Sequence, residues 1–281
     1  MDHNTQKSLS IKQQVEYIST HYQISIDLEI EKVRQYLSNI SFCRLKPYLT
    51  ALKGAPFTKI IKHYELDRKL RLIILDAIER IEVSIKAVLI NRLCEINDND
   101  PLWYSNNISF QKFEHHDRFY KMIDELKTRH KTDRDIKQSI NNNTLLPIWN
   151  IIEKLSFGDL SKLYSFLHIK DAQVVAQHFN KTPDNFKDQL HCLTYIRNLS
   201  AHHMNLFDRV MKFKVRGTRQ IFIPKNKVDT LHGYLLLIKH YILTIIPTST
   251  WGDKVTDLLQ NYQKQYQLSI KYWGIDEIYK L

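Results

Sequence analysis

An apolar repeat between residues 66 and 89 constrains the fold more than any other part of the sequence. Apolar side chains recur there at three- and four-residue steps, at Leu66, Leu70, Ile73, Ile74, Ala77, Ile78, Ile81, Ile85, Val88 and Leu89. This spacing places them on one face of an α-helix. Asp67 and Arg71 form an i,i+4 pair with the acid first, the order that supports a helix best, and we assign this pair to the polar face. The pattern predicts a helix over residues 67–94.

Glycine and proline are scarce, with 6 and 7 copies in 281 residues. Tight turns between strands depend on both residue types, so their shortage favours long helices over sheets. Weaker helical patterns, separated by helix-breaking residues, divide the rest of the chain. We predict two short helices within 11–40 and further helices near 110–140, 147–157, 159–167, 171–180, 183–203, 226–246 and 252–268. Asp159 is the expected N-cap of the helix that begins there. The expected fold class is an all-α helical bundle.

One segment departs from the helical pattern. Apolar Phe213, Val215, Ile221 and Ile223 flank the turn signal Arg-Gly-Thr in residues 213–223. Alternating apolar residues around such a turn are typical of a small β-hairpin. An ordered loop explains the same residues equally well, and the sequence leaves both alternatives open.

The whole chain, residues 1–281, is expected to form one domain, with a single weak candidate boundary in the polar region 130–146. The polar N-terminus does not resemble a signal peptide, and the most apolar stretch, 235–246, is too short to cross a bilayer, which takes roughly 20 residues. The three cysteines are odd in number and widely spaced, which argues against a disulfide framework and against a metal site built on a cysteine pair. We therefore expect a cytoplasmic protein that does not contact membranes.

The charge balance favours a polyanionic partner. The net charge is +11, from 41 Lys and Arg against 30 Asp and Glu. Basic side chains that neutralise phosphates release counterions, which makes nucleic acid a favoured ligand for such a chain. A soluble protein that is merely basic is the alternative, so charge alone ranks nucleic acid only slightly ahead.

The most informative segment for chemistry is residues 193–203, LTYIRNLSAHH, in which Arg197-Asn198 precedes His202 by an R-N-x3-H spacing. Metal-independent RNA cleavage needs a group that moves protons to and from the 2′-hydroxyl and the leaving oxygen, and a positive charge near the phosphorane. Histidine titrates near neutrality, whereas arginine stays charged and can hold two phosphate oxygens. The pattern also arises by chance on the polar face of a helix, so the motif alone is weak.

Helix geometry limits what one copy of this motif can do. Asn198 and His202 share a face at i,i+4, but Arg197 and His202 lie about 140° apart around a regular helix. A second copy of the helix, facing the first across a two-fold axis, would bring the two sets of side chains to one cleft. The sequence therefore predicts a homodimer with a composite active site, which measurement of the molecular mass in solution can test.

Several blocks of sequence together resemble the Abi-like (AbiD/AbiF) abortive-infection family of the HEPN ribonuclease superfamily. They cover roughly residues 40–210, in the family's order, and read FCRLKPYL (42–49), HYELDRKLRLIILDAIERIEVSIKAVLINRL (63–93), LPIWNIIEKLSFGDLSKLY (146–164) and LTYIRNLSAHHMNLFDR (193–209). The resemblance implies a HEPN-type helical domain in which Arg197, Asn198 and His202 are catalytic. It implies cleavage to a cyclic phosphate and a 5′-hydroxyl without a metal or other cofactor. It also implies a toxin that halts growth on phage infection.

The sequence departs from the family after the paired histidines. The family usually has an Arg-Leu-Trp-type run there, whereas this chain has Met204-Asn205-Leu206-Phe207. Bulk is retained at Phe207, but a basic group is lost, which puts nearby phosphate contacts in doubt. His203 points roughly 100° away from His202 on a helix, so packing or a phosphate contact suits it better than the main acid–base role.

Two further sets of residues are weaker candidates. Arg80 and Glu82 are accessory candidates that would brace the active-site arginine, although a solvated salt-bridge face explains them equally well. A solvated face is also the default for a basic run that is our first choice for an RNA-binding track, formed by Lys121, Lys127, Arg129, Lys131, Arg134 and Lys137. The adjacent His115 and His116 cannot face one metal from a helix and are expected at the surface.

The sequence thus predicts an endoribonuclease toxin that acts on RNA as a homodimer. A lethal nuclease must be restrained, and a basic cleft is suited to inhibition by a small structured RNA antitoxin, which is a hypothesis. The alternative is a helical RNA-binding or regulatory protein that uses the same basic cleft without cutting RNA. A third alternative, a toxin silenced by a partner enzyme that modifies it with a nucleotide, has only superfamily analogy to support it.

Overall fold

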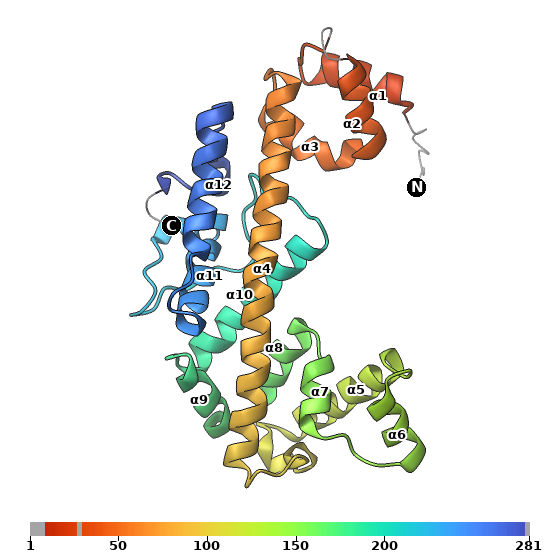
Figure 1. Cartoon of the computed structure of the whole chain (residues 1–281), viewed down its shortest axis with the longest axis vertical. Coiled ribbons are helices and arrows are strands. Elements are labelled where there is room, and N and C mark those ends of the chain that lie inside the picture. The colour runs from red at the N-terminus through yellow and green to blue at the C-terminus, as the bar shows by residue number, and fades with distance from the viewer. Residues whose placement is uncertain (1–8, 27–29, 279–281) are drawn as a thin grey trace, which may run out of the picture.

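The computed structural model describes residues 9–26 and 30–278, and all regular secondary structure in these residues is helical (Figure 1). Twelve α-helices lie in this part of the chain, with three short 3-10 turns between them and a fourth after the last helix. No strand occurs in the described ranges, although Phe110 and Leu167 form one isolated antiparallel bridge. The predicted all-α class is confirmed.

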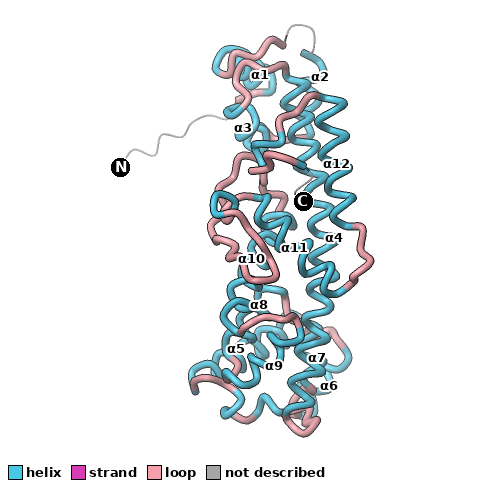
Figure 2. Tube along the Cα trace, turned by 90° about the vertical axis from the view of Figure 1, so that its left-hand side faces the viewer, coloured by secondary structure: helices cyan, strands magenta, loops and turns pink. Residues whose placement is uncertain are grey.

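Helix α4 (Phe57–Ile96) is the central helix of the fold and the longest one in the described residues. Its 40 residues correspond to about 60 Å at 1.5 Å per residue, and it runs along most of the molecule (Figure 2). It begins after Pro56, ten residues before the predicted start, because the apolar positions Phe57, Ile60 and Ile61 continue the buried face. Helices α3, α7, α9, α10, α11 and α12 all pack against it.

Three short helices form a lobe at the N-terminal end of α4 (Figure 1). They are α1 (Ile11–His21), α2 (Ile30–Asn39) and α3 (Phe42–Ala51), and the first two agree with the prediction for residues 11–40. Ser10 caps α1 through a capping box, in which its hydroxyl accepts from the Gln13 amide and the Gln13 side chain accepts from the Ser10 amide. Gly54, with φ of 80°, lies in the turn between this lobe and α4.

A second lobe forms at the other end of α4 (Figure 1). It consists of α5 (Phe113–Arg129), α6 (Arg134–Asn142), α7 (Ile148–Lys154) and α8 (Phe157–Phe166), preceded by the 3-10 turns η1 (Trp103–Ser105) and η2 (Asn107–Ser109). The prediction that Asp159 caps α8 is wrong. The N-cap is Ser156, whose hydroxyl accepts from the Asp159 amide at 3.2 Å, so Asp159 lies in the first turn, where its carboxylate suits the helix dipole.

The remaining helices complete the layer beside α4. They are α9 (Ile169–His178), α10 (Pro183–Ala201), α11 (Leu231–Ile245) and α12 (Trp251–Tyr266), with the 3-10 turns η3 (Lys225–Lys227) and η4 (Ile270–Trp273). Helix α11 is buried on most sides, which explains its nearly continuous apolar sequence. The buried residues form one continuous core that includes all of these helices.

The segment 213–223 is an ordered loop, so the hairpin alternative is wrong. Thr218 and Ile221 exchange two backbone hydrogen bonds at the tip, but no ladder follows. The backbone instead pairs with the segment before α11, where the Val215 amide donates to the Val228 carbonyl at 2.7 Å. Val215, Ile221 and Ile223 are all buried, which means that the alternation reflects separate anchors in the core and not one face of a sheet.

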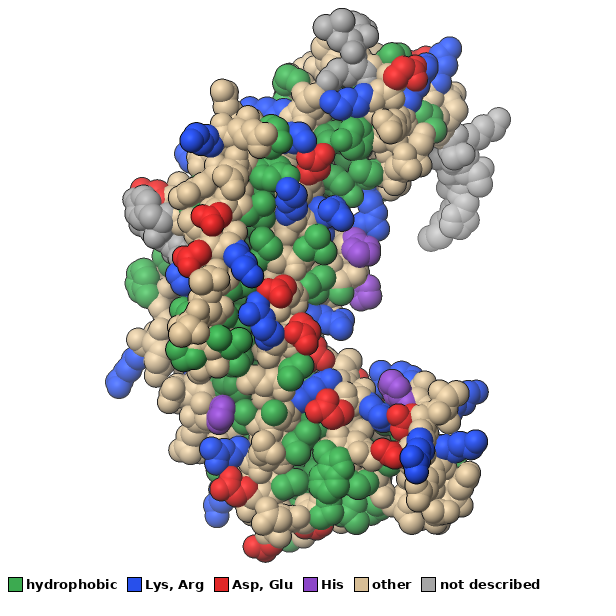
Figure 3. Space-filling model, viewed as in Figure 1, with side chains coloured by type: hydrophobic (Ala, Val, Ile, Leu, Met, Phe, Trp, Pro, Cys, Tyr) green, Lys and Arg blue, Asp and Glu red, His purple; other side chains and the backbone are tan. Residues whose placement is uncertain are grey.

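Between the two lobes the molecule is hollowed, and we call this concave side the bay (Figure 3). Histidine side chains project into the bay from its wall, and Lys and Arg side chains gather on the parts of both lobes that border it (Figure 3). The wall is formed by α4 and by the end of α10 with the loop that follows it (Figure 1).

Candidate functional site

Helix α10 carries the R-N-x3-H segment and begins with strong signals. Pro183 occupies the first turn and the Thr182 hydroxyl accepts from the Asn185 amide at 3.3 Å. The helix ends at Ala201, two residues earlier than predicted. The His203 amide donates to the Ser200 carbonyl at 3.2 Å and the Met204 amide to the Leu199 carbonyl at 2.9 Å, which is the hydrogen-bond pattern of a Schellman motif. His203 has φ of 58° and turns the chain out of the helix.

The three predicted catalytic residues lie at the exposed end of α10. Leu193, Ile196 and Leu199 bury the other side of the helix, while Asn198 and His202 are exposed and Arg197 is half-buried. His202 is the C-cap, and its amide still donates to the Asn198 carbonyl at 3.0 Å, so the i,i+4 relation between the two residues holds. None of the three side chains makes a hydrogen bond or ion pair with another described residue, which leaves all three available to a ligand.

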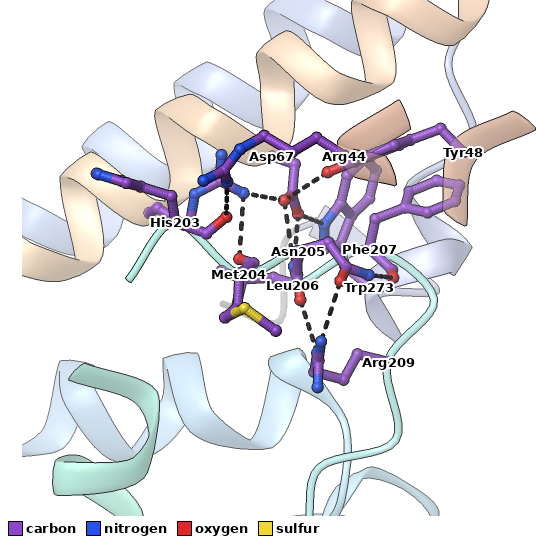
Figure 4. A network of polar contacts seen from close by, with 11 residues as sticks. Arg44, Tyr48, Asp67, His203, Met204, Asn205, Leu206, Phe207, Arg209 and Trp273 are labelled. Carbon is purple, nitrogen blue, oxygen red and sulfur yellow. Dashed lines mark hydrogen bonds and ion pairs between the residues drawn. The ribbon is translucent and has the colours of Figure 1, made fainter. Parts of the chain in front are cut away.

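A buried carboxylate on α4 holds the loop of residues 203–208 that follows α10, which we call the histidine loop (Figure 4). Asp67 is fully buried and accepts from the backbone amide of Leu206 at 3.2 and 3.1 Å. It also accepts from the Tyr48 hydroxyl at 2.8 Å and from the Trp273 indole N–H at 2.9 Å. Arg71 forms an ion pair with the same carboxylate. Helices α3 and α4, the histidine loop and η4 therefore meet at one side chain.

The assignment of Asp67 and Arg71 to the polar face is wrong. Asp67 is 0% and Arg71 5% exposed, because the histidine loop and the C-terminal segment cover this turn of α4. Burial raises the pKa of Asp67, and the charge of Arg71 and the surrounding N–H and O–H donors oppose that shift. Glu82 and Lys86, also spaced i,i+4 on α4, form an ion pair with 3.4 Å between the charged groups.

Phe207 fixes the loop from its apolar side. Its ring is buried and lies 4.8 Å from Tyr48, 4.6 Å from Tyr272 and 5.3 Å from Trp273, centroid to centroid. His63 closes the cluster on the α4 side, 5.5 Å from Phe207. The bulk at position 207 is thus used to anchor the loop.

Two arginines hold the backbone of the histidine loop. Arg44 of α3 donates to the His203 carbonyl at 2.9 Å, and Arg71 donates to the Met204 carbonyl at 3.3 Å. A cavity of about 520 Å³ opens beside these contacts, between α2, α3, α4 and the end of α10, and His203 lines it. A smaller cavity of about 110 Å³ adjoins it on the α3 side and shares Arg44, Tyr64, Arg71 and His203.

Residues 35–208 match the family described as Abi-like protein, which is more than half of the chain. This chain belongs to the Abi-like family. No curated protein and no solved structure matches it. The matched range contains Asp67 and the histidine loop, but Tyr272 and Trp273 lie outside it. The site of this Abi-like protein is therefore completed by residues beyond the family match.

The accessory residues of α4 contact their own helix. Arg80 forms an ion pair with Asp76, and Glu82 pairs with Lys86, whose ammonium also donates to the Glu153 carbonyl at 2.9 Å. In the described part of the chain, neither Arg80 nor Glu82 bonds to the side chain of Arg197. These contacts match the salt-bridge alternative for the two residues.

The residues of the predicted RNA track lie on the second lobe of this Abi-like protein. Lys127 is half-buried, and the others are exposed on α5, on α6 or between them, namely Lys121, Arg129, Lys131, Arg134 and Lys137. Arg129 reaches Asp159 at 3.4 Å, and no other member forms an ion pair with a described residue. His115 and His116 are half-buried against aromatic rings, so the expectation that they lie at the surface is wrong.

Sequence reasoning missed the residues that position the histidine loop. Asp67 and Arg71 follow the same helical register as Leu70 and Ile74, which is a signal of burial on the apolar face. Arg44 and Tyr48 stand in the block at residues 42–49, which had no role assigned. Nothing in the sequence links Trp273 to Asp67, since 206 positions separate them.

Among the described residues, no group of three or more His, Cys, Asp or Glu side chains is arranged so that it could hold a metal ion. No helix in residues 9–26 or 30–278 combines the length and the apolar character needed to span a membrane. Cys43, Cys94 and Cys192 are all free.

Proposed function

We propose that this Abi-like protein is a metal-independent endoribonuclease of the HEPN type that acts as a toxin in abortive infection. The observation that carries the proposal is the placement of Arg197, Asn198 and His202. All three lie at the end of α10, which forms part of the wall of the basic bay (Figure 1), and no described residue binds their side chains. A polar side chain whose only role was to stabilise the fold would form hydrogen bonds or ion pairs within the protein, as the side chain of Asp67 does.

Each residue has a role that suits its chemistry. His202 transfers protons, taking one from the attacking 2′-hydroxyl or giving one to the departing 5′-oxygen. Arg197 stabilises the charge that develops on the phosphorane. Asn198 orients the phosphate or the imidazole. The bond between phosphorus and the 5′-oxygen breaks as the bond to the 2′-oxygen forms, so the products are a 2′,3′-cyclic phosphate and a 5′-hydroxyl.

A composite site formed by two copies of the chain suits this geometry. Arg197 and His202 point away from each other around α10, by about 140° on a regular helix. Near this region α4 exposes two apolar side chains, Leu72 at 51% and Val83 at 56%. They lie eleven residues apart on one face of the helix, and the exposed acidic residues Asp76 and Glu79 stand between them on that face. A second copy that packs on this face would bring its own α10 towards the first.

The family description supports a role in abortive infection. Cleavage of cellular RNA would stop growth of an infected bacterium, and a basic bay is suited to restraint by a small structured RNA antitoxin. Purification tests the restraint. A preparation with full activity and no bound nucleic acid would argue against an RNA antitoxin.

Expression in bacteria tests the nuclease directly. We would induce the wild type and the Arg197→Ala/His202→Ala variant, then sequence RNA ends that carry a 5′-hydroxyl. The proposal expects growth arrest and new ends with the wild type alone. His202→Ala by itself should also abolish cleavage while leaving the thermal unfolding unchanged, because this exposed side chain has no partner in the described chain. Retained cleavage would remove His202 from the mechanism.

A non-catalytic RNA-binding or regulatory protein is the second candidate. The observation that favours it is the excess of unpaired basic side chains on α5 and α6, which can bind RNA without cutting it. Equal growth arrest from the wild type and the double variant, or arrest without new RNA ends, would support this function and argue against the nuclease.

A further inference from the structure

The cavity beside the histidine loop has the size of a small-molecule site. Its volume is about 520 Å³, within the range of roughly 300–1,000 Å³ that is common for such sites. The turn between α2 and α3 forms one side, α4 the second, and the end of α10 the third. Ser200 and His203 line it, and they flank His202 in the sequence. A ligand in the cavity therefore contacts residues on both sides of the proposed catalytic residue in the chain, although His202 itself does not line the cavity.

The charge of the cavity is entirely positive. Arg44, Arg68 and Arg71 line it together with His203, and none of the lining residues is acidic. Arg71 is already paired with Asp67, and Arg44 donates one hydrogen bond to the His203 carbonyl. Arg68 is exposed and makes no hydrogen bond or ion pair with a described residue. Free guanidinium donors that converge without a carboxylate are suited to a phosphate.

The cavity also has a polar atom without a partner and an apolar wall. The Ser200 side chain is 1% exposed, and its hydroxyl has no hydrogen-bond partner. Leu72 and Leu75, one helical turn after Arg68 and Arg71 on α4, offer apolar surface, and the ring of Tyr64 is held edge-on to Tyr48 at 5.8 Å. Aromatic rings of this kind stack on bases in single-stranded nucleic acid.

We propose that this cavity binds one nucleotide of single-stranded RNA, next to the bond that is cut. Arg44 and Arg68 bind the backbone phosphate, while Tyr64 and the two leucines contact the base. The proposal rests on the proposed function, because that function places the cut at His202. It adds a binding subsite for an unpaired nucleotide, because a base must leave its stack in a duplex before it can contact Tyr64 and the leucines.

The test measures binding separately from cleavage. The probe is a fluorescein-labelled RNA of ten nucleotides with 2′-O-methyl groups on every ribose, which cannot form a cyclic phosphate. Binding to the full chain is followed by fluorescence anisotropy between 50 and 200 mM salt, on the order of the range where phosphate contacts dominate. The variants are Arg68→Ala and Tyr64→Leu. The control is Lys254→Ala, which removes one exposed charge from α12, on the other side of α4 from the bay (Figure 1).

We expect Arg68→Ala to weaken binding by about 5–10-fold and to lower the salt slope by about 0.7, the value for one phosphate contact on a single strand. Tyr64→Leu should weaken binding by roughly fivefold or more without changing the slope, because stacking does not release counterions. Lys254→Ala should change neither quantity. A duplex of the same probe should bind equally to the wild type and to Tyr64→Leu.

Equal effects of Arg68→Ala and Lys254→Ala would overturn the proposal, since the basic surface would then act only through its total charge. Unchanged binding in both cavity variants would overturn it as well. Failure of the proposed function gives a different result: the wild type would bind the probe through the cavity but would not cleave the same RNA with free 2′-hydroxyls.

Discussion

His203 occupies a backbone conformation that a side chain with a Cβ disfavours. Its φ of 58° places it at the position of a Schellman motif that is usually glycine. Histidine is tolerated there more often than most residues, at a cost of about 1 kcal/mol. The chain retains it at a position where the imidazole lines both cavities of the site. This combination indicates a role for the side chain beyond ending the helix.

We predict that His203→Gly raises the free energy of unfolding by up to about 1 kcal/mol, because glycine relieves the left-handed strain. Urea denaturation measures the change. His202→Gly is the matched control, since His202 has φ of −88° and gains nothing from glycine. It should lower the stability by roughly 0.5–1 kcal/mol. A loss of stability in both variants would contradict the assignment.

Lys181 is a buried cation without an acidic partner in the described chain. It is 5% exposed, and its ammonium lies 2.8 Å from the Nε2 atom of His240. Burial lowers the pKa of Lys181 to about 8. Burial and the nearby charge of Lys181 lower the pKa of His240 to about 4. Folding therefore opposes the charged form of both side chains.

The substitution Lys181→Met should stabilise the protein near pH 7. The folded pKa of Lys181 is below its usual value of 10.5, so the wild type carries the full cost of the buried charge below pH 8. That cost falls as the pH rises from about 8 towards 10.5, and the advantage of the variant should shrink over the same range. Thermal unfolding at pH 7, 9 and 10 measures this trend. An advantage that grew with pH would contradict it.

At the scale of elements, one side chain of α4 ties α3, the histidine loop and η4 together. Asp67 accepts hydrogen bonds from three donors, the Tyr48 hydroxyl, the Leu206 amide and the Trp273 indole, and forms an ion pair with Arg71. The Leu206 amide belongs to the loop that follows α10. A buried carboxylate of this kind does little for net stability compared with apolar packing, but removing one partner leaves the others unsatisfied. Its main effect is to select a single position for the loop.

We predict that Asp67→Ala lowers the free energy of unfolding by roughly 3–5 kcal/mol, because it leaves Arg71 charged, buried and unpaired. The double variant Asp67→Ala/Arg71→Met should be less destabilised than the sum of the two single variants, by about 1–3 kcal/mol. Chemical denaturation of the four proteins gives this coupling energy. Additive effects would show that the two residues act independently.

At the scale of the whole molecule, the bay is shaped to receive a long ligand or a second chain. The two lobes project from opposite ends of α4, and α10 ends between them (Figure 1). Basic side chains border the bay on both lobes (Figure 3), whereas α4 between the lobes exposes the apolar side chains of Leu72 and Val83. This division suits a dimer that packs on this part of α4 and leaves the lobes open to RNA.

Mixing two inactive variants tests the composite site. Arg197→Ala and His202→Ala should each be inactive alone. After co-expression, a mixed dimer contains one site with both Arg197 and His202 intact, so about a quarter of the wild-type activity should return if subunits assemble at random. Recovery of cleavage is measured on a labelled RNA with purified mixed protein. No recovery would show that both residues must come from the same chain.

The sequence by itself determined the helical class and most of the helices. The repeat within α4, the scarcity of glycine and proline and the N-terminal signals of α10 are local properties, and helices form from local hydrogen bonds. The same reasoning placed Arg197, Asn198 and His202 near one helix end. It misjudged ends that tertiary contacts decide, such as the start of α4 and the end of α10.

Only the tertiary structure decided which polar residues are buried and which segments meet. Asp67 is at the centre of the site because Tyr48, Leu206 and Trp273 reach it from distant parts of the chain. The segment 213–223 forms a loop and not a hairpin, because its apolar side chains Val215, Ile221 and Ile223 are buried at separate positions in the core. The sequence pattern records which residue types are present, but burial and hydrogen bonding depend on contacts between residues that are far apart in the chain.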